Sequence, residues 1–178
     1  FEPNPLLYPY LNKNLKKIIS NINLYNLALS DVNGETILKL PLRSKSLFKN
    51  NIEELYQLGA ASIHPNNKFD NFKEVKVKMK KLDDIKIDKK IGFIKIDVEG
   101  HELEVIEGAK NTIINNMPVL LIEIEKRHNK KPVEKSIAHI KKIGYECFFL
   151  EKKELILVDK LQDKQLENNY YFLPKNFK

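Results

Sequence analysis

The stretch Ile91-Gly92-Phe93-Ile94-Lys95-Ile96-Asp97-Val98-Glu99-Gly100-His101-Glu102 decides how this chain folds. An apolar run opens it, and an amphipathic run over residues 103–114 follows, so a buried strand is expected to turn into a helix here. Gly100 would permit the sharp turn between the two elements.

Four acidic side chains stand at this junction, and two of them have a plain structural explanation. Glu102 and Glu104 would lie in the first helical turn, where acids complement the helix dipole. Asp97 and Glu99 follow the core of the strand instead. They are therefore the first candidates for a functional site.

The rest of the chain alternates strands and helices. Helices are expected over residues 6–19, 102–115 and 133–143, and strands over residues 22–28, 36–40, 75–79, 91–96, 119–124, 145–150 and 154–158. The strands at 36–40 and 75–79 could pair as a hairpin or lie at a sheet edge. Those at 91–96 and 119–124 are nearly continuous apolar runs, as parallel strands covered on both faces are. The pattern predicts an α/β sandwich with a mainly parallel sheet. Ligands bind at the carboxyl ends of strands in such sheets, where Asp97 and Glu99 stand.

Composition limits the other functional classes. The 178 residues suit one domain, residues 1–178. The net charge of +7 comes from scattered lysines without interleaved aromatic residues, so no nucleic-acid partner is expected. No apolar run reaches about 18 residues, so no membrane span is expected. The single cysteine, Cys147, fits a reducing compartment, and we expect a cytoplasmic location.

A long irregular connection over about residues 41–73 interrupts the first half as a loop insertion. Connections of this length are often lids or binding loops, and disorder is the alternative. Ser62 and His64 lie within it.

The run FIKIDVEGHELEVIEGA, residues 93–109, resembles the signature of the FkbM-type methyltransferases. Four other segments agree with that family in order: FEP at residues 1–3, NLALSD at residues 26–31 followed by Gly34, LDD at residues 82–84 and PVLLIE at residues 118–123. The resemblance covers roughly residues 1–125.

The resemblance implies a class I, S-adenosylmethionine-dependent O-methyltransferase with a Rossmann-like three-layer sandwich. Glu2 matches the acid that holds the ribose hydroxyls of the cofactor, and Ala28 and Leu29 match the segment that lines the adenine. Asp97 and Glu99 match the strand end near the sulfonium and the acceptor hydroxyl. The implied acceptor is a hydroxyl of a sugar, glycan or other small metabolite.

Methyl transfer to a hydroxyl requires positioning and a nearby base. Asp97 is expected near both cofactor and acceptor, with Glu99 as orienting group or base and Lys95 on the same motif. Ser62, Glu123 and His101 are candidates for contact with the acceptor. Asp97 and Glu99 could also bind a hard cation, but no further ligands are evident, so no metal site is predicted.

In the family, the first strand and a glycine-rich loop precede the FEP segment. We therefore expect this sequence to be an N-terminally truncated domain that binds the cofactor weakly or not at all by itself. Two alternatives remain open at this point: a metal-dependent hydrolase that uses Asp97 and Glu99, and a cofactor-free binding module with a Rossmann-like fold. The oligomeric state cannot be predicted.

Overall fold

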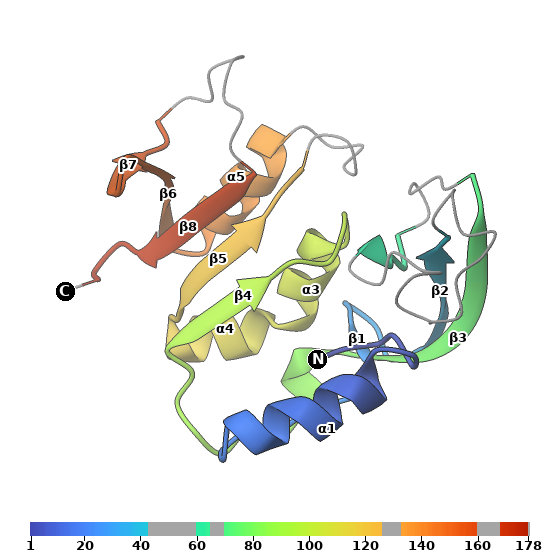
Figure 1. Ribbon diagram of the computed structural model, residues 1–178. Helices are drawn as coiled ribbons and strands as arrows, with labels where there is room; N and C mark the ends of the chain where they lie inside the picture. Colours follow the sequence, from blue (N-terminus) through green and yellow to red (C-terminus); the bar gives the residue numbers. More distant parts are fainter. Residues whose placement is uncertain (43–59, 65–69, 126–132, 160–167, 178) are drawn as a thin grey trace.

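The computed structural model describes residues 1–42, 60–64, 70–125, 133–159 and 168–177 (Figure 1). Its helices are α1 (Tyr8–Ile18), η2 (Leu82–Asp84), α3 (Glu102–Gly108), α4 (Lys110–Asn116) and α5 (Val133–Lys142). Its strands are β1 (Ala28–Leu29), β2 (Gly34–Pro41), β3 (Phe72–Lys80), β4 (Phe93–Ile96), β5 (Val119–Glu123), β6 (Tyr145–Glu151), β7 (Glu154–Leu157) and β8 (Asn169–Pro174).

The larger sheet has five strands in the order β4-β5-β8-β6-β7 and is mixed, so the predicted mainly parallel sheet is wrong. β4 and β5 are parallel, but β8 lies antiparallel between β5 and β6. β7 folds back on β6 through a tight turn in which Lys152 and Lys153 have φ values of 46° and 74°. The fold is mixed α/β. Its larger sheet is not parallel throughout because β7 reverses direction after this turn and because β8 runs antiparallel to both of its neighbours.

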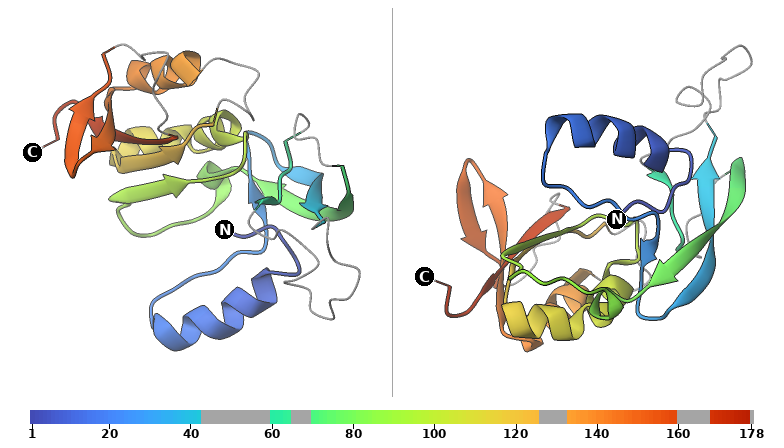
Figure 2. Two further views of the ribbon diagram at one scale, coloured as in Figure 1. Left: turned by 45° about the horizontal axis from the view of Figure 1, so that its top comes forward. Right: turned by 90° about the horizontal axis from the view of Figure 1, so that it is seen from below.

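Helices α3, α4 and α5 lie on one side of this sheet, and α1 lies on the other (Figure 2). The main core fills the space between the sheet and the three helices. Its fully buried members include Ile106, Ile113, Ile140 and Phe172. By contrast, α1 contributes no buried residue.

The smaller sheet has the order β1-β3-β2, and it confirms the predicted hairpin. β2 and β3 pair antiparallel from Gly34 opposite Met79 to Pro41 opposite Phe72. Leu38, Leu40 and Val77 form its own small core. The expected strand over residues 22–28 is much shorter, since only its end enters β1, which pairs with β3.

The helix expected over residues 102–115 is divided at Ala109, whose φ and ψ are −110° and 8°. The side chain of Asp83 caps the beginning of the second part, α4. The two carboxylate oxygens of Asp83 accept the backbone N–H groups of Asn111 and Thr112 at 2.9 and 2.8 Å. This satisfies donors that have no partner within the helix.

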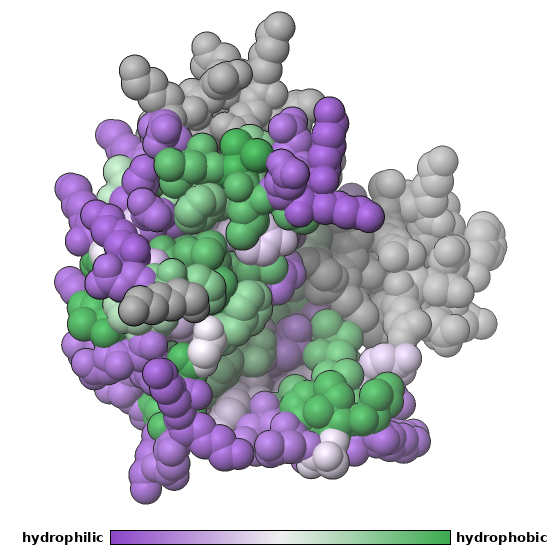
Figure 3. Space-filling model, turned by 90° about the vertical axis from the view of Figure 1, so that its left-hand side faces the viewer, coloured by the Kyte–Doolittle hydropathy of each residue, from purple (hydrophilic) through white to green (hydrophobic). Residues whose placement is uncertain are grey.

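Figure 3 shows the side of the molecule that carries β6 and β7, where hydrophobic side chains run between hydrophilic ones. Leu150, Leu155 and Leu157 are exposed in these two strands. Within the described residues, no helix is both long and apolar enough to cross a membrane.

Candidate active site

A cavity of about 290 Å³ lies between the two sheets, beside the carboxyl end of β4. Its lining brings together residues from five parts of the chain that are distant in sequence: residues 1–7, 27–29, 38, 61–63 and 95–105. Among them are most of the candidates from the sequence: Glu2, Ala28, Leu29, Lys95, Asp97, Glu99 and His101.

Glu2 is held in place by the backbone around it. Its N–H donates to the Tyr25 carbonyl at 3.0 Å, and its Oε1 accepts the Asn4 N–H at 2.7 Å. The Asn26 amide donates to the Glu2 carbonyl at 2.8 Å. Burial raises the pKa of the Glu2 carboxyl, and the hydrogen bond from Asn4 opposes that shift. The result is a partly buried carboxylate with a fixed position at the cavity.

The wall beside Glu2 is apolar. Ala28 and Leu29 supply it from β1, and Leu38 and Ile63 extend it from the smaller sheet and from residues 60–64. A flat apolar group could therefore pack against this wall, while a neighbouring group with hydroxyls could bind the Glu2 carboxylate.

Lys95 and Asp97, which both line the cavity, form an ion pair. The Lys95 Nζ lies 2.7 Å from Asp97 Oδ2, and both side chains are partly exposed. The hydrogen bond to Asp97 raises the pKa of Lys95. The pair places a carboxylate with a compensating positive charge where β4 ends.

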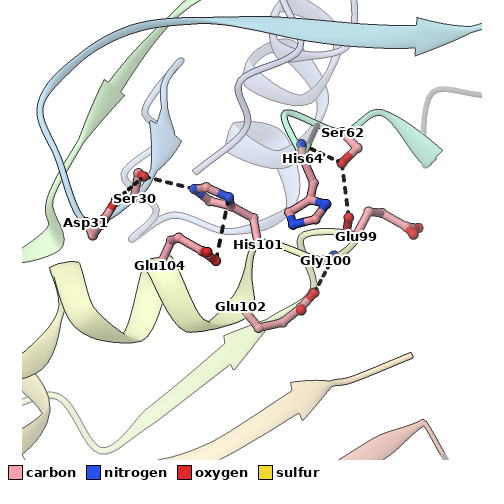
Figure 4. A network of polar contacts seen from close by, with 9 residues as sticks. All are labelled: Ser30, Asp31, Ser62, His64, Glu99, Gly100, His101, Glu102 and Glu104. Carbon is pink, nitrogen blue, oxygen red and sulfur yellow. Dashed lines mark hydrogen bonds and ion pairs between the residues drawn. The ribbon is translucent and has the colours of Figure 1, made fainter. Parts of the chain in front are cut away.

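The chain turns at Glu99 and Gly100 in the left-handed region, with φ values of 53° and 99°. The Gly100 N–H donates to Glu102 Oε1 at 2.7 Å (Figure 4). Left-handed backbone is costly for a residue with a side chain, and such strain clusters at functional sites.

His101 connects this turn to the loop after β1 (Figure 4). Its Nε2 lies 2.9 Å from Ser30 Oγ, which donates to Asp31 Oδ1 at 3.1 Å. Its Nδ1 lies 3.8 Å from a Glu104 oxygen. Burial lowers the pKa of His101, although Glu104 and Asp31 act in the opposite direction. His101 is therefore expected to be neutral at pH 7.

This environment predicts a pH-dependent stability. Because the pKa of His101 in the folded state lies below its ordinary value of 6.5, the unfolded chain binds more protons as the pH falls below that value. The free energy of unfolding should decrease from pH 7 to pH 5, and His101→Gln should show a smaller decrease. Urea unfolding at several pH values measures both, and equal decreases would contradict the assignment.

Two candidates for acceptor contact lie beside the cavity lining. The Ser62 hydroxyl donates to the Glu99 carbonyl at 3.0 Å and accepts the His64 N–H at 3.0 Å. Glu123 borders a small second pocket together with Asp97 and Glu99. Partial burial and then the charge of Asp97 raise the pKa of Glu123. Contact of either residue with an acceptor stays a prediction.

In the described part of the chain, no group of three or more His, Cys, Asp and Glu side chains is arranged to hold a metal ion.

Sequence reasoning did not assign roles to Ser30 and Asp31, although both lie in the segment at residues 26–31. The signal that could have found Ser30 is its place directly after Ala28 and Leu29, which line the cavity. Its link to His101, 71 residues further along, depends on the packing of α3 against β1.

Comparison with known proteins agrees with these observations. The model of the methyltransferase FkbM domain matches residues 1–149. The fold is similar to the crystal structure of methyltransferase FkbM from Methylobacillus flagellatus KT, with a TM-score of 0.51 and 16% identity. The similarity covers 96% of this chain and 35% of that one. No curated protein matches significantly. Because the family model matches well over half of the sequence, the chain belongs to the FkbM methyltransferase family.

Proposed function

We propose that this chain forms the cofactor- and acceptor-binding part of an S-adenosylmethionine-dependent O-methyltransferase that acts on a hydroxyl of a sugar, glycan or related metabolite. The observation that carries this proposal is the single cavity shared by Glu2, Leu29 and Asp97. These residues come from three separate segments, and family membership supports the class of chemistry.

The residues of the cavity suit the cofactor. A carboxylate accepts the hydrogens of two neighbouring hydroxyls well, and Glu2 is fixed by Asn4 in a position to do so. Ala28 and Leu29 would pack against the adenine. Bound S-adenosylmethionine supplies an electrophilic methyl group on its sulfonium.

The strand end would provide the base. An acceptor hydroxyl loses its proton as it is methylated, and a carboxylate within hydrogen-bond reach can accept that proton. Asp97 holds this place beside the cavity, paired with Lys95 at 2.7 Å. Glu99, two residues later, would orient the acceptor or share the proton. Lys95 would hold the Asp97 side chain in place through this ion pair.

Binding of S-adenosylhomocysteine tests the cofactor assignment. Glu2→Gln removes the charge from the carboxylate and should weaken binding about tenfold or more, as expected for a charge-assisted hydrogen bond. Isothermal titration calorimetry with the complete gene product that carries these residues measures the change.

The matched control is Glu35→Gln, which alters an exposed carboxylate paired with Lys76 on the hairpin. The control should bind like the natural protein. Equal affinity for Glu2→Gln and the natural protein would overturn the ribose role, and absence of binding by the natural protein would overturn the cofactor assignment.

A further inference from the structure

Three successive residues, Glu99, Gly100 and His101, are each held by a different buried polar side chain (Figure 4). Ser62 Oγ donates to the Glu99 carbonyl at 3.0 Å, and Glu102 Oε1 accepts the Gly100 N–H at 2.7 Å. Ser30 Oγ lies 2.9 Å from His101 Nε2. Among the described residues, five polar or charged ones are buried, and three of these five, Ser30, Ser62 and Glu102, meet at this turn.

Hydrogen bonds of this kind can stabilise a strained turn. Glu99 has a side chain and a φ of 53°, a conformation that costs free energy and persists only where the surroundings fix it. A buried hydrogen bond to its carbonyl oxygen stabilises that conformation directly. The Ser62 side chain is 1% exposed, so water cannot easily replace this bond.

Ser62 is itself fixed from outside the turn. Its N–H donates to the Lys39 carbonyl at 3.2 Å, and its carbonyl accepts the Lys39 N–H at 2.9 Å. Its hydroxyl also accepts the N–H of His64. The hydroxyl proton is therefore committed to Glu99, and the serine is anchored to β2.

We propose that Ser62 is a positioning residue that holds the left-handed turn at Glu99 and so fixes the Glu99 carboxylate beside the cavity. This role deepens the proposed function and depends on it for its catalytic meaning. Ala61 and Ile63 line the cavity on either side of Ser62. The segment that would contact an occupant thus also fixes the turn that carries Glu99.

The test is hydrogen exchange of the turn in Ser62 variants, measured by mass spectrometry on the complete gene product. Ser62→Ala should accelerate exchange in peptides covering residues 99–101 about tenfold, the loss expected for one buried hydrogen bond. Peptides covering β8 should change by less than about twofold, since the main core is untouched.

A matched pair of variants separates the hydroxyl from the shape of the side chain. Ser62→Thr keeps the hydroxyl. The valine of Ser62→Val has nearly the same shape as threonine but lacks the hydroxyl. In peptides covering residues 99–101, we expect Ser62→Thr to exchange at nearly the rate of the natural protein and Ser62→Val to exchange as fast as Ser62→Ala. Unchanged exchange in Ser62→Ala, equal acceleration of the turn and β8, or equal acceleration in the threonine and valine variants would overturn it.

Titration of S-adenosylhomocysteine keeps the two proposals apart. Affinity in Ser62→Ala should stay within about threefold of the natural value, because Glu2 and Leu29 are unchanged. A larger loss would overturn a role confined to the turn. If no variant and not even the natural protein binds, the cofactor assignment fails while the exchange result still decides the role of Ser62.

Discussion

Replacing Gly108 by alanine is expected to destabilise the fold by about 3 kcal/mol or more, at or beyond the upper end for overpacked sites. A β-carbon at this position would overlap the carbonyl group of Ser30, with the carbonyl carbon only 2.7 Å away. Both partners are backbone, so no side chain can move aside. The helix α3 would have to withdraw from the loop that follows β1, and β1 supplies the apolar wall of the cavity.

The measurement is the thermal midpoint. In a chain of this size each kcal/mol lowers Tm by about 2–4 °C, so a decrease of about 10 °C is expected for Gly108→Ala. Gly92→Ala is the control, because nothing lies within 4 Å of a β-carbon there. Similar midpoints for the two variants would show that α3 and β1 do not pack as described.

Replacing Asp97 by asparagine should reduce methyl transfer by about 100- to 1000-fold, within the range typical of general-base removal. Asparagine has nearly the same shape but cannot accept the proton of the acceptor hydroxyl. It also leaves Lys95, now 2.7 Å from Asp97 Oδ2, without its ionic partner. Both changes affect the cavity and leave the main core intact.

Transfer of a labelled methyl group from S-adenosylmethionine to a hydroxyl acceptor measures this loss. Asp88→Asn is the matched control, since that carboxylate is exposed and paired with Lys86 at 3.5 Å. A rate within about threefold of the natural value would exclude Asp97 as the base, because general acid–base groups contribute far more than that.

The elements that the sequence predicts well are those with a strong local signal. The strands β2 and β3 have alternating side chains, and the structure confirms that they pair antiparallel. The strand β4 with its acidic turn is predicted because an apolar run, a glycine and an amphipathic run follow one another directly.

The elements that the sequence does not predict depend on distant partners. The residues of β8 read only as a short apolar group, Tyr170–Leu173, in a polar tail. Their place between β5 and β6 is decided by side-chain packing across the sheet, since Tyr170 and Phe172 are buried there. Contact of Ser62 with the acceptor stays a prediction. Its hydrogen bond to the carbonyl of Glu99, 37 residues further along, has no local signal in the sequence.

In the candidate site, too, residues with a local sequence signal could be predicted, and contacts between distant residues could not. Glu2, Ala28, Leu29 and Asp97 could be named from the resemblance to the family, and the structure brings them to one cavity. The contact of His101 with Ser30 could not be named, since it joins residues 71 positions apart. Neither residue carries a pattern that specifies the other.

The position of β8 in the sheet has a consequence for the growing polypeptide. β8 occupies the central position of the larger sheet, where it pairs with β5 on one side and with β6 on the other. A ribosome completes β5, β6 and β7 before it reaches β8, so until then the two halves of the sheet have unpaired edges that face each other. Folding must wait for a late segment, and exposed strand edges invite aggregation. The edges of β5 and β6 are therefore open to pairing with other chains until β8 has been synthesised.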